Sequence, residues 1–102
     1  MPAGFFSIKV DQIIRETKDA VCVVLDIPQH LRSQFDYKAG QYLTFSIMIN
    51  GEEVRRSYSL CSSPVTDNKP SIAVKEVEGG KMSTYLNNEL KEGDMLEIMP
   101  PM

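Results

Sequence analysis

A short segment combines a cation, a phenol ring and several hydroxyl groups at alternating positions. Arg56 and Tyr58 are two residues apart, so in a strand both side chains project from the same face. A guanidinium binds phosphate through charge-assisted hydrogen bonds, and a phenol ring stacks on a planar ligand. Ser57 and Ser59 add hydroxyls that could bond to the heteroatoms of a ring. The segment indicates a surface for a phosphorylated aromatic ligand, although a merely polar outer strand would contain the same residues.

A second segment places two glycines directly before a cation and two hydroxyl residues. Gly79 and Gly80 precede Lys81, and Ser83 and Thr84 follow shortly after. Glycine lets a backbone come close to a ligand, and the first turn of a helix presents free N–H groups with a dipole that favours anions. The segment indicates a diphosphate-binding loop, although a glycine pair before a helix also forms a simple turn.

The charge balance limits the partners of the chain. Its 102 residues include 11 Lys and Arg against 14 Asp and Glu, a net charge of −3. A general nucleic-acid binder would be basic, so no nucleic-acid partner is expected. An acidic protein that binds a dianion must gather its cations at one place, and the candidates are Arg56, Lys75 and Lys81.

Several classes of protein are excluded by composition. With two cysteines and one histidine, the chain has too few ligands for a disulfide framework, a Cys₄ zinc site or an iron–sulfur cluster, so no metal is expected. The longest apolar stretch, residues 21–25, is far shorter than the ~20 residues that span a membrane. No basic leader precedes an apolar run at the N-terminus. We therefore expect one cytoplasmic domain with its own core.

Alternation and turn residues predict many short strands. One helix is expected, with Ser83 as its N-cap and Gly93 just beyond its end. A single helical turn is expected over residues 31–35 and a polar loop over residues 62–70. These elements indicate a small closed antiparallel barrel. The expected strands are residues 7–10, 20–27, 42–49, 53–61, 71–77 and 95–99.

Asn50 and Gly51 form the strongest hairpin signal, because both residues tolerate positive φ. A two-residue turn would place Arg56 opposite Phe45, and so direct a guanidinium to the apolar face. A three-residue loop over residues 49–51 would instead place Arg56 opposite Thr44 and Tyr58 opposite Tyr42, on the polar face. We expect the second register.

Four segments resemble one known family. Residues 56–62, Arg-Ser-Tyr-Ser-Leu-Cys-Ser, resemble the Arg-x-Tyr-Ser-x-x-Ser flavin motif of the ferredoxin–NADP reductase-like family. Residues 80–86 resemble its Gly-x-x-Ser-x-x-Leu motif, residues 37–43 its Gly-Gln-Tyr turn into a strand, and residues 72–77 the strand between the two motifs. Within the family, the closest resemblance is to reductase components of multicomponent oxygenases of the phenylacetyl-CoA type.

The resemblance implies an all-β fold: a six-stranded antiparallel Greek-key barrel with one short helix, formed by residues 1–102 and holding FAD on its outer surface. Arg56 would bind the diphosphate, Tyr58 would stack on the isoalloxazine ring, and Ser59 would lie near flavin N5, so that Tyr58 and Ser59 are the catalytic candidates. Strict alternation places Ser59 on the face opposite Tyr58, so its contact needs local twist or a backbone amide. FMN is the alternative cofactor, which the loop over residues 80–83 disfavours. The implied cofactor-binding residues are Arg56, Ser57, Tyr58, Ser59, Val74, Lys75, Val77, Gly80, Lys81, Met82 and Ser83.

The same resemblance implies an oxidoreductase that passes electrons from NAD(P)H to an iron–sulfur centre or an oxygenase component. Family members continue into a nicotinamide-binding domain, and this type usually adds a [2Fe-2S] ferredoxin domain; the motifs of neither are present here. The isolated chain is therefore expected to turn over slowly or not at all. A plain binding barrel, such as an oligonucleotide-binding fold, is the alternative, but the acidic charge and the aromatic content of 8% disfavour it.

Overall fold

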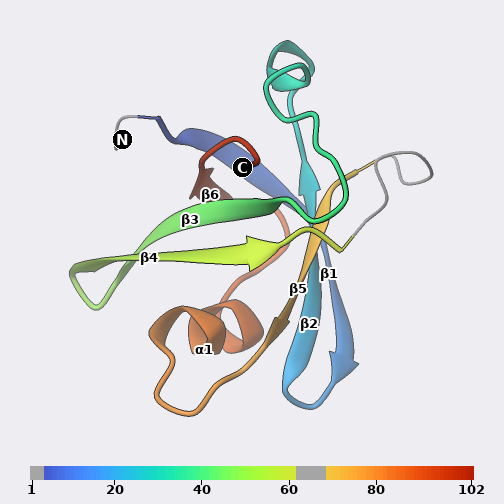
Figure 1. Ribbon diagram of the computed structural model, residues 1–102. Helices are drawn as coiled ribbons and strands as arrows, with labels where there is room; N and C mark the ends of the chain where they lie inside the picture. Colours follow the sequence, from blue (N-terminus) through green and yellow to red (C-terminus); the bar gives the residue numbers. More distant parts are fainter. Residues whose placement is uncertain (1–3, 62–68) are drawn as a thin grey trace.

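The residues that the structure describes form six strands, one α-helix and one 3-10 helix (Figure 1). A computed structural model of the chain describes residues 4–61 and 69–102. Ser62 of the first motif and residues 63–68 of the expected polar loop lie outside these ranges. The elements in chain order are β1 (Phe6–Thr17), β2 (Ala20–Asp26), η1 (Gln29–Leu31), β3 (Tyr42–Ile49), β4 (Glu52–Ser59), β5 (Ser71–Lys75), α1 (Lys81–Asn88) and β6 (Met95–Ile98).

The strands form one antiparallel sheet in the order β4-β3-β6-β1-β2-β5. Its two outer strands meet where Leu60 bridges Ile72 and where the N–H of Cys61 donates to the carbonyl of Ser71 at 2.9 Å. These bonds close the sheet into a barrel. The expected six-stranded antiparallel barrel with one short helix is thus confirmed.

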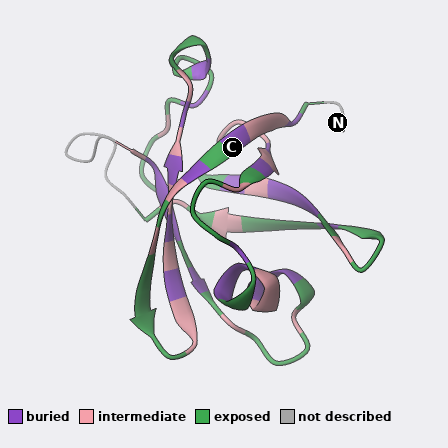
Figure 2. Ribbon diagram, turned by 180° about the vertical axis from the view of Figure 1, so that it is seen from behind, coloured by how far each residue is buried: buried purple, intermediate pink, exposed green. Residues whose placement is uncertain are grey.

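The barrel interior is filled by the apolar residues that alternate along each strand. Val21, Val23 and Leu25 of β2 are fully buried, as their spacing predicts. Met82 and Leu86 of α1 are buried against the same core, so the helix covers one end of the barrel. Figure 2 shows this alternation as buried bands along the strands and on one side of α1. The burial of these side chains removes apolar surface from water, which is the main stabilising contribution to the fold.

Strand β1 is longer than expected. The alternation of residues 7–10 predicts only its first part, whereas the strand continues to Thr17 with register shifts after Val10 and Arg15. The second part is mainly polar and exposed, and it is held by pairing with β2 rather than by burial. A pattern of alternating apolar residues cannot reveal a strand of that kind.

The hairpin register that we expected is wrong. Ile49 pairs with Glu52, so Asn50 and Gly51 form a two-residue turn, both with positive φ, at 52° and 79°. Such a turn matches the right-handed twist of the two strands. Arg56 consequently pairs with Phe45, on the same face of β4 as buried Val54.

The helix also differs from expectation at both ends. It begins at Lys81 with Gly80 as N-cap, so Ser83 lies in the first turn rather than at the cap. It ends at Asn88, well before Gly93, which has a φ of 92° and donates from its N–H to the carbonyl of Val10 at 2.8 Å. Gly93 therefore belongs to the turn into β6 and not to the helix end. Within the described residues, no helix is long and apolar enough to cross a membrane.

Candidate functional site

Strands β4 and β5 are bridged at one end and diverge toward their other ends. The bridge between Leu60 and Ile72 lies at one end of β4, and from there the two strands diverge, with α1 between their far ends (Figure 1). The helix contacts both strands. The alternating residues of β4 that share a face with buried Val54 therefore point to the region between β4, β5 and α1. That set includes Arg56 and Tyr58.

Tyr58 is half-buried, and its ring contacts another aromatic ring. Its ring packs edge-on against Phe45, with centroids 5.9 Å apart and an interplanar angle of 69°. Burial raises the pKa of the Tyr58 phenol above its ordinary value, and the nearby Arg56 guanidinium opposes the shift. The phenol is therefore neutral at physiological pH, and its ring is partly open to solvent.

Arg56 offers an exposed guanidinium on the same face as Tyr58. Its Nη1 donates to the main-chain carbonyl of Arg55 at 2.7 Å. None of the ion pairs among the described residues includes Arg56. The exposure of Arg56 explains why the two-residue turn is tolerated: the sheet opens here, so the guanidinium reaches solvent instead of the core.

The loop before α1 is held by the hydroxyl of Ser83. This buried oxygen accepts a hydrogen bond from the N–H of Val77 at 3.0 Å and donates to the carbonyl of Gly80 at 3.4 Å. A Cβ added at Gly80 would lie 2.6 Å from Ser83 Oγ and 3.0 Å from the carbonyl oxygen of Val77, so only glycine fits without displacing the loop. Ser83 thus shapes the loop, whereas the sequence suggested a hydroxyl directed to a ligand.

The first turn of α1 presents main-chain donors. Gly80 makes no side-chain cap, and the first helical hydrogen bond runs from the N–H of Thr84 to the carbonyl of Gly80 at 3.1 Å. The N–H groups of Lys81 and Met82 precede that bond. Since the side chain of Met82 is buried in the core, only its main chain can contact a ligand.

One carboxylate connects the helix start with β4. Glu52, the first residue of β4, forms an ion pair with Lys81, the first residue of α1. The pKa of Glu52 is lowered chiefly by its hydrogen bond with Lys81 and also by the charge of Arg56. Arg56 and Lys81 therefore lie close enough to act on the same group. The fold brings the two segments singled out in the sequence to one place.

The other residues expected to bind the cofactor lie on the opposite face of β4 or in and just after β5. Ser57 and Ser59 lie on the opposite face of β4 from Tyr58, and Ser57 Oγ is 2.8 Å from Thr44 Oγ. The carbonyl of buried Val74 accepts a hydrogen bond from Asn87, while Lys75 is exposed at the end of β5. Val77 is 60% exposed, although its N–H is bonded to Ser83.

Two residues that the sequence did not single out support this site. Buried Asn87 donates through Nδ2 to the carbonyls of Val74 at 3.1 Å and Ser83 at 2.9 Å. Arg15 donates to Asn87 Oδ1 at 3.1 Å and to its main-chain carbonyl. These bonds link β1, β5 and α1. A polar residue in a short helix gives no sequence signal of such a role, because its partners are distant along the chain.

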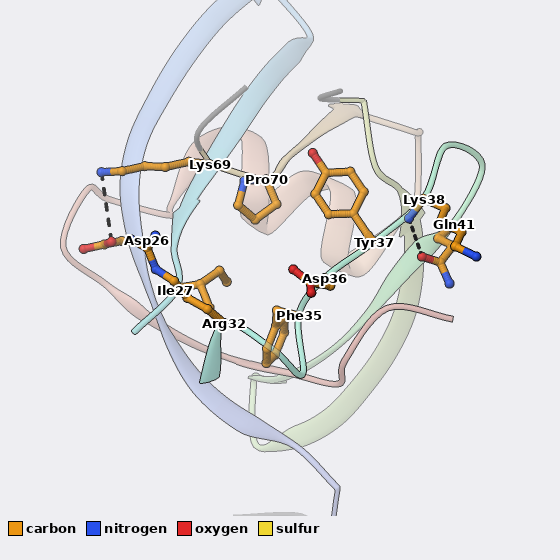
Figure 3. Close-up of a pocket in the computed structure, with 10 residues that line it drawn as sticks. All are labelled: Asp26, Ile27, Arg32, Phe35, Asp36, Tyr37, Lys38, Gln41, Lys69 and Pro70. Carbon is orange, nitrogen blue, oxygen red and sulfur yellow. Dashed lines mark hydrogen bonds and ion pairs between the residues drawn. The ribbon is translucent and has the colours of Figure 1, made fainter. Parts of the chain in front are cut away.

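A separate pocket of about 620 Å³ lies at the loop between β2 and β3 (Figure 3). Phe35, Tyr37 and Pro70 contribute rings to it, and Asp26 approaches Lys69 at its rim at 4.0 Å. None of the expected flavin-binding residues lines this pocket. The region between β4, β5 and α1, with its cations, main-chain donors and aromatic ring, is chemically suited to a phosphorylated planar ligand, and the pocket is a distinct feature.

Comparisons with known proteins agree with this chemistry. Residues 7–102 match the model of the oxidoreductase FAD-binding domain family. The chain is 39% identical over 97 residues to a component of the 1,2-phenylacetyl-CoA epoxidase of Escherichia coli K12, covering 95% of this chain and 27% of that protein. It is 39% identical over 93 residues to the ferredoxin reductase component of 3-ketosteroid-9-alpha-monooxygenase of Rhodococcus rhodochrous, covering 90% and 26%.

Solved structures share the fold. Phthalate dioxygenase reductase, described as a modular structure for electron transfer from pyridine nucleotides to [2Fe-2S], superimposes with a TM-score of 0.76 at 30% identity, covering 97% of this chain and 30% of that one. A flavohemoglobin from Malassezia yamatoensis with bound FAD and heme superimposes with a TM-score of 0.76 at 27% identity. The match covers 95% of this chain and 24% of that one. The chain thus spans about a quarter of the length of the curated relatives from Escherichia coli and Rhodococcus rhodochrous.

Proposed function

The chain belongs to the oxidoreductase FAD-binding domain family, and from this membership we propose that it is the flavin-carrying part of a longer NAD(P)H-dependent reductase. Its family and its barrel fold are those expected from the sequence motifs, and FAD is the cofactor of the family. The residues present fit that cofactor. A guanidinium, an ammonium group and free main-chain donors suit a diphosphate, and a rigid aromatic ring suits a planar heterocycle.

In the proposed arrangement, Arg56 and the start of α1 bind the diphosphate. Lys81 contributes charge, and Gly80, Lys81 and Met82 contribute main chain. Ser83 acts by holding the loop in shape through its bond with the Val77 N–H. Lys75 at the exposed end of β5 would contribute main-chain groups to the approach, next to Val74. The N–H of Val77 is bonded to Ser83 and its carbonyl to the Gly80 N–H, so Val77 would contribute its exposed side chain. Support comes from Glu52, whose carboxylate interacts with both Lys81 and Arg56.

Tyr58 would hold the isoalloxazine ring by stacking and cover one of its faces from water. The bound flavin supplies the chemistry of hydride acceptance from nicotinamide and of electron transfer onward. Because Ser59 points away from Tyr58, its proposed role near flavin N5 requires its main-chain N–H or a local change in twist. Ser57 lies on the same face of β4 as Ser59, and its hydroxyl bonds with that of Thr44, so we assign Ser57 a supporting role in β4.

The remaining steps belong to parts of the proposed longer protein. We propose a nicotinamide-binding domain as hydride source and a [2Fe-2S] domain, followed by an oxygenase component, as electron acceptors. The names of the relatives from Escherichia coli and Rhodococcus rhodochrous, an epoxidase and a monooxygenase component, support this scheme. We also propose a cytoplasmic setting, because two cysteines are too few for the disulfide framework of a small secreted domain.

The observation that carries the proposal is the convergence of Arg56, Tyr58 and the start of α1 on one region. A visible absorption spectrum of the purified chain, repeated after incubation with FAD or FMN and desalting, tests it. Retained bands near ~370 and ~450 nm, the absorption of oxidised flavin itself, are expected. Chromatography of the released cofactor then separates FAD from the alternative, FMN. A protein that binds neither flavin, even with its nicotinamide domain supplied, would contradict the proposal.

A further inference from the structure

An acidic side chain lies among the cations of the proposed diphosphate site. Glu52 is on the same face of β4 as Arg56, because the two positions differ by an even number of residues. Its carboxylate forms an ion pair with Lys81 at the first position of α1. Within the described parts of the chain, this carboxylate is the one that pairs with Lys81. A negative charge is thus held where the proposed function requires an anion to bind.

This ion pair contributes little to the stability of the fold. The side chains of Lys81 and Glu52 are 56% and 61% exposed, and ion pairs so open to water contribute little to folding. The pair also joins residues that are distant in sequence, at the tip of the β3–β4 hairpin and at the helix start. Its main physical effect is local: it neutralises the ammonium group of Lys81 next to the free N–H groups of the helix.

We propose that Glu52 is an internal competitor of the flavin diphosphate and sets the affinity of the domain for phosphorylated flavins. This inference rests on the proposed function. In the structure the carboxylate is paired with the ammonium group of Lys81. A diphosphate that binds at the helix start would replace Glu52 as the partner of Lys81. The carboxylate of Glu52 would then lie, without its ion pair, near the negatively charged diphosphate. Both effects weaken binding, so Glu52 favours release of the cofactor.

The size of the effect follows from Coulomb's law. Two unit charges of the same sign a few ångströms apart in water repel by an energy equivalent to about a fivefold change in a binding constant. The Glu52→Gln substitution keeps the shape of the side chain and removes this charge. We therefore expect Glu52→Gln to bind FAD about three- to tenfold more tightly than the parent chain at low ionic strength.

The neighbouring Glu53 provides a matched control. Its carboxylate lies on the opposite face of β4, where it accepts hydrogen bonds from Ser46 Oγ at 2.6 Å and from Arg55 Nε at 2.9 Å. Glu53→Gln removes the same formal charge from the same hairpin without altering the proposed site. Any general effect of net charge on FAD binding will therefore appear in both variants.

The test is a titration of the chain and both variants with FAD, followed by flavin fluorescence. Glu52→Gln should bind more tightly, Glu53→Gln should stay within about twofold of the parent, and the advantage of Glu52→Gln should shrink in about 0.5 M salt. Equal affinities of the two variants, or weaker binding by Glu52→Gln, would overturn the inference.

A second titration with inorganic pyrophosphate separates this inference from the proposed function. Amide NMR shifts of Lys81 and Met82 report on the helix start directly. If no form of the chain binds FAD but Glu52→Gln binds pyrophosphate more tightly than Glu53→Gln, the FAD function fails and the role of Glu52 stands. If pyrophosphate binds both variants equally, the role of Glu52 is refuted whatever FAD does.

Discussion

The side-chain amide of Asn87 donates a hydrogen bond to the main-chain carbonyl of Val74 across 3.1 Å, in the buried space between α1 and β5. The same amide bonds to the carbonyl of Ser83 at 2.9 Å, and its oxygen accepts from Arg15 at 3.1 Å. Asn87 therefore adds a polar link between α1 and β5 to the apolar packing of Met82 and Leu86 against the core. A buried polar group that is fully bonded fixes a geometry, because each alternative leaves donors or acceptors unpaired.

Replacing Asn87 with alanine should destabilise the domain. The change removes the bonds of Asn87 to the carbonyls of Val74 and Ser83 and its bond with Arg15, so the free energy of unfolding should fall by about 2–3 kcal/mol. Urea denaturation measures it. Asn88→Ala is the control: Asn88 is exposed, with bonds to Glu76 and Thr84, and should change stability by less than about 0.5 kcal/mol. Equal losses in the two variants would refute the role of Asn87.

A side chain at Gly80 should displace the hydroxyl of Ser83. Gly80→Ala would place its Cβ 2.6 Å from Ser83 Oγ, so the bond from the Val77 N–H must shift. We expect a loss of about 1–3 kcal/mol, partly relieved in the double variant with Ser83→Ala. The double-mutant cycle from chemical denaturation measures this coupling. Additive losses would show that the two residues do not interact.

Loss of the Arg56 guanidinium should weaken flavin binding without unfolding the domain. A charge-assisted bond to a phosphate predicts that Arg56→Ala costs about 1–3 kcal/mol of FAD binding free energy. Riboflavin, which has no phosphate, should be unaffected. The comparison is Arg55→Ala, because Arg55 lies on the other face, paired with Glu53 and placed 5.0 Å from the centre of the Phe5 ring. Calorimetry that finds the two variants equal would exclude Arg56 from phosphate binding.

The two thiols should react at different rates, although the fold brings them together. Cys61 is exposed and lies 3.2 Å from Ser71 Oγ, whereas Cys22 is partly buried and interacts with both. Burial is the main reason that the pKa of the Cys22 thiol is raised, so less of it is thiolate near pH 8 and it should react more slowly. Labelling with a disulfide reagent should show two phases. Cys61→Ser should remove the fast phase and Cys22→Ser the slow one; the reverse assignment would contradict the structure.

The isolated chain should be a poor enzyme even when it holds FAD. Hydride transfer requires nicotinamide against the flavin, and the proposed longer protein would supply that placement from another domain. NADH oxidation by the FAD-loaded chain should be ~100-fold or more slower than by a version extended with its nicotinamide domain. Stopped-flow bleaching of the flavin measures both. Comparable rates would show that the barrel alone positions the nicotinamide.

The motifs identified in the sequence lead to the right fold, but not to the right side of the strand. The expected register places Arg56 on the polar face because, in a half-buried strand, one face contacts the core and the other contacts solvent. In the structure β4 is an outer strand of the sheet and separates from β5, so a side chain on the inner face reaches solvent. The Asn50-Gly51 signal by itself indicated the two-residue turn that is observed.

Local residue types and short spacings were sufficient to predict the barrel, the alternating core of β2 and β3, the hairpin at Asn50 and Gly51, and the family. Which groups meet depends instead on the folded arrangement of the whole chain. Glu52 forms an ion pair with Lys81, Asn87 donates a hydrogen bond to Val74 of β5, and Ser83 accepts one from the N–H of Val77. Such contacts depend on how the strands twist and where the helix packs, and neither is encoded in the local pattern of one segment.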